Sequence, residues 1–116
     1  MTFKQLDRYL QSKQGATFDY PFDEEVRVYR IAEKMFALTS EKHPLRVNLK
    51  CDPIYALELH SIYEGVSAGY HMNKKHWNTV MLEETDVDDE SVRELIDHSY
   101  DLVYKSLTKK KRETLG

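Results

Sequence analysis

The chain has one cysteine, no apolar run of membrane-spanning length and no glycine-rich phosphate loop. Cys51 cannot form an intrachain disulfide by itself, and this fits a reducing cytoplasm. A spanning helix needs roughly 20 apolar residues, and the first residues lead into a helical pattern without a charged-then-apolar secretory segment. We therefore expect a soluble cytoplasmic protein that does not contact a membrane.

The remaining composition is typical of one globular domain. The 116 residues are 41% hydrophobic and 11% aromatic, and no internal repeat or low-complexity segment interrupts them. A chain of this size hides roughly two thirds of its unfolded surface when it folds. We expect a single domain over residues 1–116, with a basic C-terminal tail from about residue 105, and we favour a monomer.

Charge is unevenly distributed along the sequence. The net charge is −3, from 17 basic and 20 acidic residues. Residues 83–101 contain nine acids and one arginine, so the rest of the chain has 16 bases against 11 acids and carries +5. One basic and one acidic surface on the same domain are consistent with this pattern, although mixed solvated surfaces are more common.

Hydrophobic spacing predicts three helices. They cover residues 2–13, the segment from Asp52 to about Gly65, and a final segment from Asp88 into the basic tail. Asp52 is expected to cap the second helix, with Pro53 at its first position, where the missing N–H costs nothing. One stripe of the last helix is expected to be buried, and it consists of Val92, Leu95, Ile96, Ser99 and Val103.

Strands are predicted between these helices, at residues 26–31, 34–39, 45–51 and 77–82, with one more before residue 77. In 45–51 the apolar residues alternate with Arg46, Asn48 and Lys50, so one face packs and the opposite face is basic. The order α-β-β-β-α-β-β-α predicts an α+β domain with an antiparallel sheet of about five strands and three helices. Helices are expected to cover one side of this sheet.

Residues 65–80 concentrate the residue types that functional sites use. Two glycines, two histidines, two lysines, two asparagines and the only tryptophan occur in this stretch, GVSAGYHMNKKHWNTV. The flanking segments read as ordinary amphipathic helices and strands. We therefore place the candidate functional region here.

The same stretch resembles the signature of the MmcQ/YjbR family of small bacterial proteins, in GYHMNK at 69–74 and HWNTV at 76–80. Segments 35–38, 47–53 and 95–103 are also similar to family segments, so the resemblance extends over most of the chain. The resemblance implies a double-wing fold and non-enzymatic DNA binding.

The pattern assembles neither a catalytic nor a metal site. In the predicted strand 45–51, alternation places Cys51 on the same face as the apolar residues, so we expect its thiol to be buried and unreactive. His71 and His76 lack further ligands at a suitable spacing. We predict no catalytic residue, no cofactor and no metal. An enzyme or small-ligand site centred on His71, Asn73, His76 and Trp77 is the least favoured alternative.

DNA binding suits these residue types better. Lysines neutralise phosphates, asparagines contact phosphates or read base edges, and aromatic rings stack on bases. The candidate DNA-binding residues are Arg46, Asn48, Lys50, His71, Asn73, Lys74, Lys75, His76, Trp77 and Asn78.

Structural roles compete with DNA contact at several of these positions. Trp77 also suits a core, Asn73 also suits a turn, and Lys74 and Lys75 also suit an ordinary solvated surface. A protein partner is a further alternative for the same surface, because aromatic residues flanked by polar ones mark protein interfaces.

Overall fold

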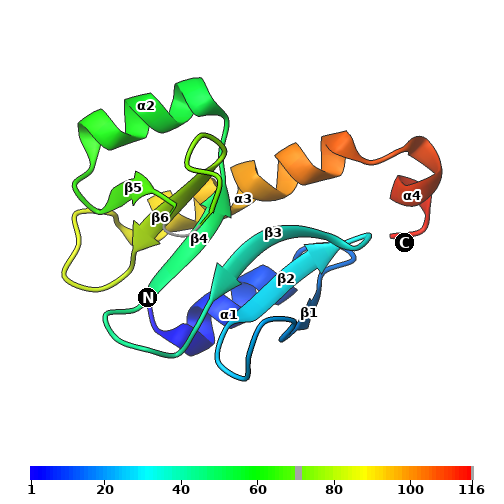
Figure 1. The fold of residues 1–116 in the computed structure, drawn as a ribbon, viewed down its shortest axis with the longest axis horizontal. Helices are drawn as coiled ribbons and strands as arrows, with labels where there is room; N and C mark the ends of the chain where they lie inside the picture. The colour runs from blue at the N-terminus through cyan, green and yellow to red at the C-terminus, as the bar shows by residue number, and fades with distance from the viewer. Residues whose placement is uncertain (70–71, 116) are drawn as a thin grey trace.

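The computed structural model of the protein describes residues 1–69 and 72–115. In this part of the chain, a six-stranded sheet and four helices form the fold (Figure 1). None of these helices is both long and apolar enough to cross a membrane. The elements are, in chain order, α1 (Phe3–Gln11), β1 (Thr17–Asp19), β2 (Arg27–Ile31), β3 (Lys34–Thr39), β4 (Arg46–Lys50), α2 (Pro53–Ile62), β5 (Val66–Ala68), β6 (Trp77–Met81), α3 (Asp89–Ser106) and α4 (Lys109–Glu113).

The sheet has the strand order β1-β2-β3-β4-β6-β5, and all neighbouring strands are antiparallel. The predicted α+β class with an antiparallel sheet is therefore confirmed. Two short elements were missed, β1 and α4. A strand of three exposed residues has no alternation to reveal it, and α4 has no buried residue and hence no apolar stripe.

Helices pack against one face of the sheet and form the main core. Figure 1 shows α1 and α3 behind the strands, and α2 lies beside β5 and contacts α3. The ring of Tyr55 meets His98 edge-on at a centroid distance of 4.9 Å, and Tyr63 Oη lies 3.3 Å from Ser91 Oγ. Fully or almost fully buried side chains of this core include Leu6, Leu10, Tyr29, Ile31, Phe36, Leu45, Val47, Leu49, Val80, Val92 and Ile96.

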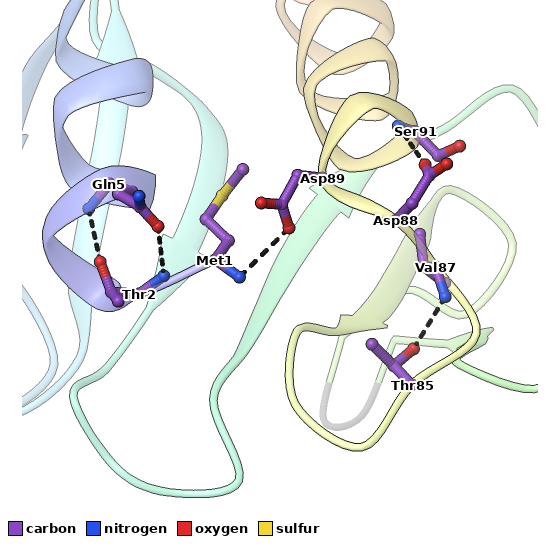
Figure 2. A network of polar contacts seen from close by, with 8 residues as sticks. All are labelled: Met1, Thr2, Gln5, Thr85, Val87, Asp88, Asp89 and Ser91. Carbon is purple, nitrogen blue, oxygen red and sulfur yellow. Dashed lines mark hydrogen bonds and ion pairs between the residues drawn. The ribbon is translucent and has the colours of Figure 1, made fainter.

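Side-chain caps fix where the helices begin. The predicted cap of α2 is confirmed, because the Asp52 carboxylate accepts N–H bonds from Ile54 and Tyr55, both at 3.1 Å. Figure 2 shows the N-terminal ends of α1 and α3 side by side. There, Thr2 and Gln5 form a capping box, and the Met1 amino group lies 3.1 Å from Asp89.

Ser99 joins α3 to the two central strands. The predicted stripe of α3 is buried as expected, and Ser99 is its polar member, with an exposed fraction of 0%. Its hydroxyl donates to the Phe36 carbonyl oxygen at 2.6 Å and accepts from the Lys50 N–H at 2.9 Å. The β3–β4 pairing ends at Ala37–Leu49. The Ser99 hydroxyl therefore bridges the Phe36 carbonyl and the Lys50 N–H, which would otherwise form the next hydrogen bond between β3 and β4.

Candidate functional site

No helix of residues 1–69 and 72–115 covers the second face of the sheet. The register aligns Leu38, Asn48 and Thr79 across β3, β4 and β6 on this side, whereas Val47 and Leu49 point into the helical core. We call this side the open face. Among the described residues, the side chains that β2, β3, β4 and β6 place on the open face are Val28, Leu38, Arg46, Asn48, Lys50, Trp77, Thr79 and Met81.

A small apolar cluster lies on the open face, separate from the helical core. It contains Val28, Leu38 and Trp77, and Val26, Met35 and Met72 pack against it. Trp77 is 8% exposed, so it is a core residue of this second cluster and offers little ring surface to a ligand. The sequence left open whether Trp77 is a core residue or a DNA contact, and its burial shows that it is a core residue.

Beside this cluster, the open face is hollowed into a pocket of about 460 Å³. Its lining combines apolar and polar side chains from four segments: Phe22, Val26, Leu38, Thr39, Ser40, Arg46, Asn48 and Met72. Phe22 is 66% exposed, whereas Phe36 of β3 is fully buried. The Thr79 hydroxyl donates to Asn48 Oδ1 at 2.7 Å and so fixes the orientation of the Asn48 amide.

One basic side chain, Arg46, lines this pocket. Alternation along β4 places Arg46 and Lys50 on the same side as Asn48. Arg46 is exposed, and it forms no ion pair with another residue of the described chain. Its guanidinium is therefore available to an anion.

Two more cations lie in the turn before β6, where Lys74 and Lys75 are both exposed. Asn73 builds this turn: its side-chain oxygen accepts the Lys75 N–H at 3.0 Å, and its carbonyl oxygen accepts the N–H groups of His76 and Trp77 at 3.1 and 3.0 Å. The turn-forming role proposed for Asn73 is thus what the structure shows.

Asn78 is buried on the opposite face. It is 3% exposed, and its Oδ1 lies 2.8 Å from His60 Nε2 on α2. The prediction that Asn78 contacts DNA is therefore corrected, because the alternation of β6 turns this side chain under α2.

His76 is half-buried and accepts the Cys51 N–H through its carbonyl oxygen at 2.8 Å. The candidate His71 lies outside the described residues.

Sequence reasoning missed the apolar part of the pocket. Phe22, Val26, Leu38 and Met72 come from separate segments, and only their positions in space bring them together. One signal was present in the sequence: Phe22 is a large apolar residue in a loop that otherwise contains Pro21 and acids.

Cys51 is 3% exposed, as its parity predicted. Burial raises the pKa of its thiol to about 11, and the negative charge of Asp52 adds to this effect. The thiolate is the nucleophilic form of cysteine, so this thiol is a poor nucleophile near neutral pH. Burial also lowers the pKa of His98, whose Nε2 accepts the Asp52 N–H at 3.2 Å.

Comparison with known proteins gives one consistent family. The YjbR family model matches residues 11–102. The uncharacterized protein YbdF of Escherichia coli O157:H7 is 40% identical over 92 residues, which cover 78% of this chain and 75% of YbdF. The uncharacterized protein YjbR of Escherichia coli K12 is 30% identical over 116 residues, with coverage of 99% and 98%.

A solved structure agrees with these sequence matches. The crystal structure of the Deinococcus radiodurans protein DR2400, with a DUF419 domain, superposes with a TM-score of 0.90 at 37% identity. The superposition covers 99% of this chain and 88% of DR2400. The resemblance seen in residues 69–80 is therefore confirmed over nearly the whole chain, which belongs to the YjbR family.

Proposed function

We propose that the protein binds DNA through the open face and catalyses no reaction there. The observation that carries this proposal is the position of Arg46 and Lys50, on either side of Asn48 on a strand face that none of the described helices covers. Such cations attract phosphates, and the amide between them can donate to a phosphate or a base edge. The resemblance of residues 69–80 to the MmcQ/YjbR signature also supports a DNA partner.

The absence of acids from the central strands favours the same face, while Asp23, Glu24 and Glu25 lie in the loop between the pocket residues Phe22 and Val26. Strands β3, β4, β5 and β6 contain no aspartate or glutamate. The acidic segment 83–101 follows β6 and continues along α3, on the other side of the sheet (Figure 1). A phosphate backbone can therefore approach the open face without meeting a carboxylate on these strands, although the net charge of the chain is negative.

Salt dependence tests this proposal. Fluorescence anisotropy should show binding of labelled DNA to the wild type that weakens as salt rises, because bound cations release counterions from the phosphates. Replacing Arg46 and Lys50 by alanine together should weaken binding to all sequences alike. It should also flatten the plot of log K against log salt by about two units, roughly one for each lost phosphate contact.

The turn before β6 contains a second pair of cations, Lys74 and Lys75, that can be tested by the same salt titration of DNA binding. Replacing Lys74 and Lys75 together should act like the strand pair if the turn also contacts phosphates. Lys109 and Lys110 of α4 are a matched control, because they are two adjacent exposed lysines on another element. If the wild type binds no DNA, or if the control pair lowers binding as much as the strand pair, the proposal is wrong.

Protein binding is a second candidate, favoured by α2. Ile54, Leu57 and Ile62 are 79%, 71% and 58% exposed, and large apolar side chains gathered on a surface mark protein contacts. An association through these residues should respond little to salt, in contrast to DNA binding by the open face. Leu57→Ser, which removes the apolar side chain without adding a charge, should leave DNA binding unchanged if the open face is the DNA surface.

A further inference from the structure

The pocket of the open face is built for an apolar, flat group with polar edges. Its volume of about 460 Å³ falls within the range of roughly 300–1,000 Å³ that is common for small-ligand sites. Phe22, Val26, Leu38 and Met72 provide apolar walls, and Arg46 and Asn48 provide polar groups. A group that binds here must therefore present both a hydrophobic face and hydrogen-bonding atoms.

Phe22 is the part of the wall that a ligand would cover. The other large side chains of the wall are more buried: Leu38 is 6% exposed, and Val26 and Met72 are intermediate. A phenyl ring with 66% exposure costs hydration free energy in the unbound protein, and this cost is relieved when another flat ring stacks on it. Nucleobases stack on aromatic side chains in this way, largely independently of their sequence.

The polar groups have fixed roles toward such a ring. Asn48 Oδ1 already accepts the Thr79 hydroxyl, so the Asn48 amide nitrogen is the group left to donate to a base edge. Arg46 lies two residues away on the same side of β4, and Lys50 lies two residues away in the other direction. The Cα atoms of Arg46 and Lys50 are therefore about 13 Å apart along the strand, at about 3.3 Å per residue.

We infer that this pocket takes one unstacked base of single-stranded DNA, with Phe22 and Met72 against the base and Arg46 and Lys50 on the phosphates that flank it. This inference rests on the proposed function and narrows it to single strands. A base in a duplex is covered on both faces by its neighbours, so only an unpaired base can enter a pocket walled by side chains. The protein should accordingly prefer single-stranded to duplex DNA.

The test compares a labelled oligonucleotide of about 12 nucleotides with the same strand annealed to its complement, within the usual site sizes of roughly 4–16 nucleotides. Fluorescence anisotropy should show tighter binding of the single strand by the wild type. Phe22→Ala should weaken single-strand binding on the order of tenfold, because stacking on one base is lost. Phe22→Trp should restore it, and Phe22→Ala should leave duplex binding unchanged.

Ile54→Ala is the matched control, since Ile54 is 79% exposed on α2 and lies away from the open face. It should leave both affinities unchanged. Because Phe22 is exposed, Phe22→Ala should also keep the wild-type melting temperature. A strand of abasic sites should bind wild type and Phe22→Ala equally, because it retains the phosphates and lacks the stacking ring.

Different outcomes separate this inference from the proposed function. If Phe22→Ala binds the single strand as well as the wild type while the Arg46/Lys50 double variant loses binding, the open face binds DNA and the base pocket is wrong. If a mononucleotide binds as tightly as the oligonucleotide, the pocket is a small-molecule site and the single-strand inference is overturned. If the wild type binds neither DNA, the proposed function itself fails.

Discussion

Gly69 and Trp77 are in direct contact across the β5–β6 edge of the sheet. The Gly69 N–H donates to the Trp77 carbonyl oxygen at 2.7 Å, and a Cβ built on Gly69 would lie 2.9 Å from Trp77 Cβ and 3.0 Å from that oxygen. Because part of this contact is with backbone, a side chain at position 69 cannot be accommodated by a rotamer change alone. The position of the tryptophan on the open face thus depends on a glycine opposite it.

Gly69→Ala should displace Trp77 and lower the free energy of unfolding by about 1–3 kcal/mol, the usual cost of overpacking. The chain has one tryptophan, so its fluorescence emission reports this site alone and should shift to longer wavelength in the variant. Urea denaturation measures the stability change. Ser67→Ala, at an exposed position of β5 just before Gly69, is the control. Unchanged emission and stability in Gly69→Ala would contradict the contact.

Ser99→Ala should destabilise the protein by about 1–3 kcal/mol, because the Phe36 carbonyl and the Lys50 N–H would both lose their buried partner. The cost arises from two unpaired backbone groups, since the change in side-chain volume is small. Ser61→Ala on α2 is the control, because Ser61 is exposed. Equal denaturation midpoints for the two variants would show that the Ser99 bridge contributes nothing.

Asp7 should stabilise the protein in a pH-dependent way. Its carboxylate accepts from the Tyr29 hydroxyl and from Arg27 Nη1, both at 2.6 Å. Burial raises the pKa of Asp7, but the hydrogen bonds from Tyr29, Gln11 and Arg27 outweigh it, so the pKa lies below the ordinary 3.8. A lowered pKa in the folded state gives stability that is present above pH 3.8 and is lost as the pH falls below it.

Asp7→Asn should therefore cost about 1 kcal/mol near neutral pH, a value that allows for solvent screening of a half-buried group. The difference from the wild type should shrink at a pH below 3.8, where the wild-type carboxylate also becomes protonated. Denaturation curves at the two pH values measure this. Asp101→Asn, at an exposed position, is the control. A pH-independent difference for Asp7→Asn would refute the linkage.

Cys51 should react slowly with a thiol reagent in the native protein and fast after denaturation, because it is 3% exposed and its pKa is raised to about 11. A raised pKa in the folded state favours the neutral thiol, so its contribution to stability is present below the ordinary value of 9.0 and is lost as the pH rises towards 11. Wild type should lose more stability over this range than Cys51→Ala. Rapid native labelling would instead favour the enzyme alternative.

Local pattern was sufficient to predict much of the fold. The strand at 34–39, the cap at Asp52 and the buried stripe of α3 were predicted from residues close in the sequence, because helix and strand periods and capping chemistry act over a few positions. Alternation in 45–51 also placed Arg46, Asn48 and Lys50 on one side of β4. Two of these three residues line the pocket of the open face.

The remaining site depends on contacts between distant segments. Residues 77–80 are all buried, so β6 shows no alternation, and the sequence did not reveal that Trp77 faces the open side while Asn78 faces α2. Phe22, Leu38 and Met72 become neighbours only when the strands pair and the chain before β6 folds over them. The sequence alone thus determined the elements and the polar side of β4, through interactions between near neighbours. Tertiary packing decided which face each side chain of β6 occupies and where the pocket lies, because both depend on contacts between segments far apart in the chain.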